Sequence, residues 1–506
     1  MTHMQSLAPD PIEHVDVLFI GAGISGIGAA YELKHQCPGK SFLLLDAFSG
    51  FGGTWHWHKY PGIRSDSDLF TFGFRFKPWL GSPIASRDEI LKYLGEVIED
   101  EQLAPHIRYN HRVAKASWSS SENRWRIEAE HEGRTVVFTC TFLWMCQGYY
   151  RHSKGYTPDW PDMEKFSGPI IHPQTWPEDL DYDGKRVIVI GSGATTATVV
   201  PAIAGKCSHV TVLQRSPTYF TPIKNSNRLA DTLRELKIDE NVVHDIVRRK
   251  IVHDQRMFLG RALAEPDAVK TELIDALEKY LPREVIDEHF VPSYRPWQQR
   301  IAAVPDGDLF EAVASGKASI VTDHIDGFTE RGIRLRSGRE LEADIIVTAT
   351  GFDLCVLGDI NFMMDGEPLH FSETVNYRGM MFTGVPNMAW IFGYFRAASW
   401  TLRVDLVADF VCRMLNHMDK VGADRVTVGL RPEDADMELL PWIDGETFNP
   451  GYLMRGVHLL PKRGDKPEWS HSQDYWWEKD ALPLVDLEDA AFNYETAADA
   501  RAGRKA

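Results

Sequence analysis

The chain has 506 residues, enough for about three domains with large buried cores. Its 55 Lys and Arg against 72 Asp and Glu give a formal net charge of −17, which argues against nucleic acid or an anionic membrane as a non-specific partner. The six cysteines form no C-x-x-C pair, which excludes the usual redox dithiol and paired-thiolate zinc motifs.

The sequence gives no sign of a membrane segment. Acidic residues precede the first apolar run, which is not the pattern of a signal peptide. Residues 187–205 carry no charge, but their Gly, Ser, Thr and Pro content is typical of a strand, a loop and a helix. We therefore expect a soluble, cytoplasmic protein with free thiols.

The first predicted unit is a dinucleotide-binding motif. Residues 15–20 form an almost continuous apolar run, as in a parallel strand covered on both faces. The run leads into the G-x-G-x-x-G pattern of Gly21, Gly23 and Gly26, where glycines allow a tight turn, close approach of a pyrophosphate and close helix packing. A second apolar run ends at Asp46, whose carboxylate can accept hydrogen bonds from ribose hydroxyls.

A G-G-x-W-x-x-x-x-Y-P-G-x-x-x-D motif follows, and it contains Gly53, Thr54, Trp55 and Asp66. His56 and His58 lie inside this motif, but two histidines at i and i+2 without a third ligand do not make a metal site. We therefore predict no metal.

A further motif, F-x-G-x-x-x-H-x-x-x-W-P, is formed by Phe166, Gly168, His172, Trp176 and Pro177. Any one of these residues could be structural. The complete set at this spacing is more specific.

A second glycine loop follows the apolar residues 186–190. Its dinucleotide-binding residues would be Gly191, Gly193 and Thr195. Thr196 replaces the usual third Gly or Ala, so we expect the helix to lie slightly further from its strand. The next strand is followed by Arg215 rather than an acid, which favours the 2′-phosphate of NADP, although a solvated surface arginine is the alternative.

The remaining chain offers two arginines and a late helix. Arg295 and Arg300 lie in one Tyr-Arg-Pro-Trp-Gln-Gln-Arg segment. Ser399 is a plausible N-cap for a helix that ends before Gly422. Such a helix could direct its N-terminus at a cofactor or simply belong to the core.

Together these motifs resemble those of type I Baeyer–Villiger monooxygenases, and roughly residues 12 to 465 are similar to a branch with mycobacterial members. The resemblance implies FAD, NADPH and O2, and oxygen insertion beside a ketone to give an ester or lactone through a C4a-peroxyflavin, with sulfides or thioamides as side substrates. An N- or S-oxygenating flavin monooxygenase, which usually lacks the terminal Trp-Pro, and a non-catalytic flavin-binding redox sensor are the alternatives.

The resemblance also assigns roles. It places the loop around Trp55 on the flavin, makes Asp66 the active-site acid, and makes Arg300 the cation that stabilises an anionic peroxide, with Arg295 as the competing candidate. Guanidinium suits this role because it stays charged at any working pH. A surface Arg300 and a structural Asp66 are the alternatives.

The implied fold is α/β with two Rossmann-like domains. The segments around Gly148 and Gly351 resemble the crossings between the two domains of such flavoproteins. We expect residues 1–148 and 341–485 to form the FAD domain, and residues 149–340 to form the NADP domain with a helical insertion at about 225–290. Residues 486–506 are predicted to be a disordered tail.

Overall fold

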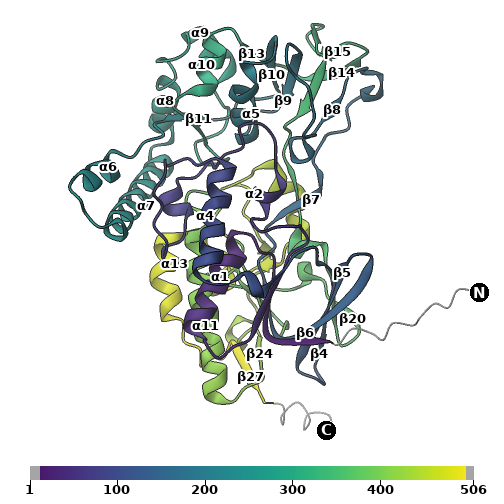
Figure 1. The fold of residues 1–506 in the computed structure, drawn as a ribbon, viewed down its shortest axis with the longest axis vertical. Coiled ribbons are helices and arrows are strands. Elements are labelled where there is room, and N and C mark those ends of the chain that lie inside the picture. The colour runs from purple at the N-terminus through teal and green to yellow at the C-terminus, as the bar shows by residue number, and fades with distance from the viewer. Residues whose placement is uncertain (1–11, 497–506) are drawn as a thin grey trace, which may run out of the picture.

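A computed structural model describes residues 12–496 and contains two Rossmann-like sheets, the larger one below the smaller one in Figure 1. The larger sheet has the strand order β20-β19-β4-β5-β6-β1-β2-β3, and β23 pairs with β6 outside this path. Its strands are β1 (Glu13–Ile20), β2 (Phe42–Leu45), β3 (Ile107–Arg108), β4 (Arg112–Ser119), β5 (Arg124–His131), β6 (Arg134–Met145), β19 (Asn361–Met364), β20 (Glu367–Pro368) and β23 (Met388–Trp390). β1 is parallel to β2 and β6, whereas β4, β5 and β6 form an antiparallel meander.

Burial on both faces explains why the second half of β1, Val17–Ile20, is entirely apolar. Val17 and Phe19 belong to the core with α1 (Ile24–Gln36) and α11 (Trp400–Val421), and Leu18 and Ile20 belong to the core on the opposite face. Successive side chains of a strand point to opposite faces, so neither face of β1 offers room for a polar residue between Val17 and Ile20.

The late helix has the predicted ends, with one difference. Ser399 is the N-cap residue of α11, and Gly422 ends the helix with φ of +70°. The Ser399 hydroxyl does not cap the helix but lies 2.6 Å from the hydroxyl of Thr71. Trp400 Nε1 instead donates to Ser25 Oγ at 2.7 Å, which ties α11 to the start of α1.

The smaller sheet is entirely parallel, in the order β13-β10-β9-β17-β8. Its strands are β8 (Ile170–Ile171), β9 (Arg186–Ile190), β10 (His209–Gln214), β13 (Ala318–Thr322) and β17 (Ile345–Thr348), and α5 (Ala194–Ala204) and α10 (Asp308–Ala314) pack on it. Because β17 pairs with β9, the boundary expected at residue 340 was wrong: the second domain extends to Thr348. An antiparallel sheet of β14 (Ile325–Thr329), β15 (Gly332–Leu335) and β16 (Glu340–Glu342) precedes β17.

The chain crosses between the two sheets twice, and the crossings pair with each other. β7 (Tyr150–Gly155) leaves the larger sheet and runs antiparallel to β18 (Phe352–Leu354), which returns to it. Gly148 and Gly351 precede these strands with φ of +75° and +107°, values that L side chains rarely adopt. Both glycines therefore lie at the turns into the crossings.

The helical insertion is present but is shared between the two domains. It consists of α6 (Arg228–Glu235), α7 (Glu240–Ala264), α8 (Pro266–Asp275) and α9 (Arg283–His289). Val243 and Val247 of α7 belong to the core of the larger domain, whereas Ile274 and Ile286 belong to the core of the smaller one. In Figure 1, α6 and α7 extend to the side of the junction between the domains.

Arg248 fixes α7 to the larger domain. Its Nη1 lies 2.9–3.2 Å from the carbonyl oxygens of Phe70, Thr71 and Gly73, and its Nη2 lies 3.0 Å from Asp405 of α11. Both partners of the ion pair are buried. Burial raises the pKa of Asp405 to about 6, and the charge of Arg248 opposes this shift.

The remaining elements surround the two domains. They are α2 (Thr54–Trp57), α3 (Leu69–Phe72), α4 (Arg87–Asp100), β11 (Phe220–Ile223), β12 (Ala302–Pro305), β21 (Asn376–Tyr377), β22 (Met381–Phe382), β24 (Arg425–Val428), β25 (Leu440–Pro441), α12 (Gly451–Gly456), β26 (Lys462–Arg463), α13 (Tyr475–Ala481) and β27 (Phe492–Glu495). β27 pairs with β24, so the disordered tail predicted from residue 486 was wrong up to residue 496; residues 497–506 lie outside the described part of the chain. Among residues 12–496, no helix is long and apolar enough to cross a membrane.

Replacement of Arg248 by Met should lower the free energy of unfolding by about 3–5 kcal/mol, because it leaves Asp405 buried without its partner. Arg249→Met is the matched control. Arg249 forms an exposed pair with Asp245 and should contribute less than about 1 kcal/mol. Urea denaturation of the three proteins measures the difference, and equal midpoints for the two variants would contradict the assignment.

Candidate active site

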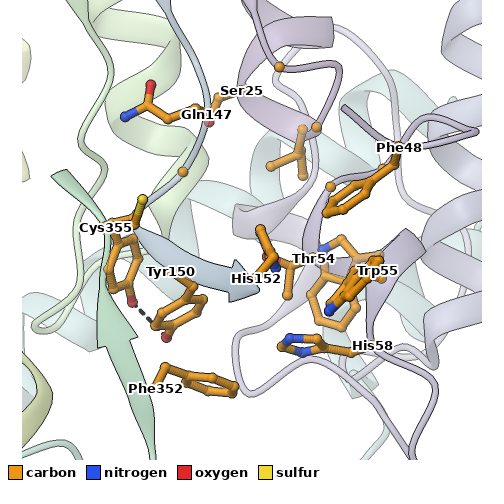
Figure 2. A pocket seen from close by; sticks show the side chains of 18 of the residues that line it. Ser25, Phe48, Thr54, Trp55, His58, Gln147, Tyr150, His152, Phe352 and Cys355 are labelled. Carbon is orange, nitrogen blue, oxygen red and sulfur yellow. Dashed lines mark hydrogen bonds between the residues drawn. The ribbon is translucent and has the colours of Figure 1, made fainter. Parts of the chain in front are cut away.

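A cavity of about 650 Å³ lies between the two domains. The site residues expected from the sequence that line it are Gly21, Gly23, Asp46, Gly53, Thr54, Trp55, Asp66, Thr195 and Arg300. Figure 2 shows Phe48, Trp55 and His58 on one side, with Tyr150, Phe352 and Cys355 opposite them. Segments from both domains therefore line one cavity.

The first glycine loop is shaped by two close approaches. Gly21 has φ of +105°, and a Cβ there would lie 2.8 Å from the carbonyl oxygen of Cys146. A Cβ on Gly26 would lie 2.0 Å from the carbonyl oxygen of Gly21, so only glycine allows α1 to start this close to β1. Gly23 is different: its Cβ would be 3.6 Å from the Cα of Gly53, an ordinary contact. The protein backbone therefore requires Gly21 and Gly26, while Gly23 leaves space beside the loop.

Asp46 lies at the end of β2, as the glycine-loop pattern requires. Its carboxylate accepts hydrogen bonds from the backbone N–H groups of Ala22 at 2.7 Å and Phe48 at 2.8 Å. Burial raises the pKa of Asp46 to about 6, although both hydrogen bonds act in the opposite direction. Asp46 thus connects the first loop to one end of the cavity.

The Gly-Gly-Thr-Trp segment packs directly on the first glycine loop. The backbone N–H of Gly52 donates to the carbonyl oxygen of Ala22 at 2.9 Å. Gly53 has φ of +56° and is the N-cap of α2, which carries Thr54 and Trp55 into the cavity. Two loops that are distant in sequence thus form one continuous wall.

The second glycine loop repeats the first, except at its third position. A Cβ on Gly191 would lie 2.3 Å from the carbonyl oxygen of Ala349, whereas a Cβ on Gly193 would meet nothing within 4 Å. Thr196 is accommodated because its hydroxyl donates to the carbonyl oxygen of Gly191 at 3.0 Å. This bond fastens the helix to the loop in place of the usual close glycine contact. Arg215, after β10, is exposed.

Arg300 and Asp66 are brought together across 234 positions of sequence. Arg300 Nη2 lies 2.9 Å from Asp66 Oδ2, and both side chains line the cavity, each about one third exposed. The negative charge of Asp66 raises the pKa of Arg300 further. Arg295, the competing candidate, instead donates to the backbone oxygen of Thr447 at 3.1 Å and does not line the cavity.

The residues of the F-x-G-x-x-x-H-x-x-x-W-P motif do not line the cavity. They pack within the smaller domain and against its junction with the larger one. A Cβ on Gly168 would lie 2.3 Å from the carbonyl oxygen of Asp344. His172 Nδ1 accepts the N–H of Gln174 at 3.1 Å, so its Nε2 carries the hydrogen and donates to the carbonyl oxygen of Gly351 at 3.0 Å. The other members pack in or beside the core of this domain: Phe166 and Trp176 are buried, and Pro177 is half-buried.

Several residues of the wall were not predicted from sequence. The side chains of Trp57, His58, Gln147 and His152 each bury a polar atom without a hydrogen-bond partner within the protein. Burial also lowers the pKa of His58 to about 3 and of His152 to about 4, so both rings are neutral at pH 7. Among residues 12–496, no cluster of His, Cys, Asp or Glu could hold a metal ion.

This donor set suits a bound dinucleotide. Polar atoms that are buried without partners in the protein can bond to a ligand or to ordered water, and Gly23 lines the same cavity as these atoms. No sequence pattern reveals these four residues as a group. They come from two distant segments, and the fold brings these segments together where β7 begins.

Two glycine loops that each follow a parallel strand of a separate sheet and flank one shared cavity define an α/β oxidoreductase of the two-dinucleotide type. Family models match the chain twice, as an NAD(P)-binding Rossmann-like domain at residues 20–79 and as flavin-binding monooxygenase-like at residues 83–253. The chain is 45% identical to the FAD-containing monooxygenase EthA of Mycolicibacterium smegmatis over 92% of this chain and 94% of the relative. It is 42% identical to the probable FAD-binding monooxygenase AlmA of an Acinetobacter species over 97% and 99%.

The chain therefore belongs to the family of FAD-containing monooxygenases. Among solved structures, it is similar to an oxidised steroid monooxygenase bound to NADP, with a TM-score of 0.77 and 22% identity over 96% of this chain and 100% of the other. A cyclohexanone-bound cyclohexanone monooxygenase gives a TM-score of 0.75 and 20% identity over the same shares. The predicted α/β fold with two Rossmann-like units is confirmed.

Substitution of Gly23 and of Gly26 should have different effects on folding and on cofactor binding. Gly23→Ala should fold normally and lose FAD, because its Cβ finds ordinary contacts in the protein but fills space beside the loop. Gly26→Ala should destabilise the cofactor-free protein itself, since its Cβ collides with a backbone oxygen. The FAD-to-protein ratio and the melting temperature of the cofactor-free forms test this. A melting temperature lowered equally in both variants would be evidence against the distinction.

Proposed function

We propose that this chain is an NADPH- and O2-dependent monooxygenase that inserts one oxygen atom beside a ketone carbonyl to give an ester or lactone. Sulfides and thioamides are proposed as side substrates. The single observation that carries the proposal is the Arg300–Asp66 pair on the wall of a cavity that both glycine loops border. It is supported by the similarity to a structure with bound cyclohexanone.

In this proposal the larger domain binds FAD. The loop of Gly21, Gly23 and Gly26 takes the pyrophosphate, Asp46 takes the adenosine ribose, and the Gly53–Trp55 segment adjoins the flavin. When bound and reduced by NADPH, FAD would activate O2, so that one oxygen atom enters the substrate and the other leaves as water. His58 and His152 add no charge to the wall of the cavity at pH 7.

Arg300 supplies the positive charge that ketone oxygenation requires. A carbonyl oxygen gains negative charge when the carbon is attacked, and a preorganised cation stabilises that charge. Guanidinium has several donors in a planar fork, so Arg300 can bond Asp66 with one nitrogen and leave others for the substrate. Asp66 positions the fork.

The smaller domain is proposed to bind NADPH through Gly191, Gly193 and Thr195. The open space at Gly193 allows a pyrophosphate close to the backbone, and Thr195 lies on the cavity wall. Arg215 is exposed at the end of β10, where a 2′-phosphate can reach it from solvent. The steroid monooxygenase with bound NADP supports this choice of cofactor.

Arg300→Ala should retain FAD and lose ester formation to below roughly 1% of the wild-type rate, given the size of such electrostatic effects. Oxygen consumed with NADPH should then appear as hydrogen peroxide. Arg300→Lys should not restore the ester, because ammonium lacks the planar fork. Product analysis on a ketone panel measures this, with Arg295→Ala as the control that should keep most activity. Near wild-type ester yield from Arg300→Ala would refute the role.

Arg215→Ala should raise the KM for NADPH about 10- to 100-fold, since a charge-assisted hydrogen bond contributes roughly 1.5–3 kcal/mol. NADH kinetics should change little, because NADH has no 2′-phosphate. Steady-state oxidation of both cofactors measures the effect. An equal loss with NADH would make Arg215 a structural residue.

A further inference from the structure

Two adjacent tyrosines stand at the start of the crossing β7, on the same cavity wall as Arg300. Tyr149 and Tyr150 both line the cavity. The Tyr149 ring stacks on Trp400 with centroids 5.2 Å apart, and the Tyr150 ring packs on Phe352 at 4.4 Å. Each ring is thus held by a neighbour from a different segment. Figure 2 shows Tyr150 and Phe352 together, with the Tyr150 hydroxyl on a hydrogen bond.

The hydrogen bond between these tyrosines has a direction. The Tyr149 hydroxyl donates to the Tyr150 oxygen at 2.8 Å, so the hydrogen of Tyr150 is left for another acceptor. Donation from Tyr149 also strengthens Tyr150 as a donor, because hydrogen bonds in a chain polarise one another. Burial raises the pKa of both phenols, which keeps both protonated at pH 7.

Arg300 lines the same cavity as both tyrosines. Its positive charge opposes the rise in pKa at Tyr149 and Tyr150, as it does at Tyr452 of α12. The cavity that Arg300 and both tyrosines line therefore contains a free phenol hydrogen and a guanidinium fork. Two donors around one acceptor position are the usual construction of an oxyanion site.

We infer that Tyr150 is a further catalytic residue, which donates a hydrogen bond to the carbonyl oxygen of the substrate beside Arg300. Tyr149 is a positioning residue, which orients the Tyr150 hydroxyl. This inference rests on the proposed function, because it requires a substrate with a carbonyl oxygen. It also assigns the tyrosines a part in substrate choice: a sulfide has no carbonyl oxygen and gains nothing from Tyr150.

The test compares Tyr150→Phe with wild-type holoenzyme on two kinds of substrate. With cyclohexanone, 2-octanone and phenylacetone, kcat for ester or lactone should fall roughly 100-fold, the usual effect of removing one oxyanion donor. With methyl phenyl sulfide, the rate should change less than about twofold. Tyr149→Phe should lower the ketone rate by a smaller factor, and FAD content should stay constant. Tyr31→Phe, on α1 and stacked on Phe76 outside the cavity, is the control.

A binding measurement separates this inference from the proposed function. Titration of the oxidised enzyme with the three ketones without NADPH, followed by flavin absorbance, should give a Kd about 3- to 10-fold higher in Tyr150→Phe, the value of one neutral hydrogen bond. If wild type binds a ketone but forms no ester, the proposed function fails, and the titration still tests Tyr150. Equal Kd and equal ketone turnover in Tyr150→Phe would overturn the inference, as would an equal loss with the sulfide. If no ketone binds or reacts with wild type, both fail.

Discussion

The pairing of the two crossings, β7 with β18, is the constraint on which the site depends. Because the smaller domain is inserted into the larger one, the chain passes between them twice. The two connecting strands pair with each other. His172 donates a hydrogen bond to the carbonyl oxygen of Gly351 at this junction. Its ring also packs against Gly155, where a Cβ would lie 2.2 Å from His172 Cε1. Residues from both domains can then meet in one cavity with fixed geometry.

The parts of the fold that depend on local contacts could be predicted from the sequence. A Cβ on Gly26 would collide with the carbonyl oxygen of Gly21 in the same turn, so this requirement can be recognised within six residues of sequence. The domain boundary could not be predicted from the sequence, because β17 joins the smaller sheet by pairing with β9, 158 positions earlier, and apolar strands of either domain look alike. β27 likewise owes its order to pairing with β24 and not to its own composition.

Some residues of the candidate site could likewise be predicted from the sequence, and others could not. The proximity of Arg300 and Asp66 could be anticipated only through a family resemblance, because no spacing rule relates residues 234 positions apart. Tyr149 and Tyr150 were missed because two adjacent tyrosines carry no pattern. Their meaning arises from the direction of one hydrogen bond and from a cation supplied by another domain. Electrostatic function of this kind belongs to the folded molecule.

Helix α7 gives the molecule a fixed internal length. Its 25 residues extend about 37 Å, with Val243 and Arg248 held in the larger domain and Ala262 packed against Tyr219 of the smaller one. A helix resists stretching and shortening along its axis. The contacts at the two ends of α7 therefore set the separation of the two domains along its axis, on the side of the molecule where α7 lies.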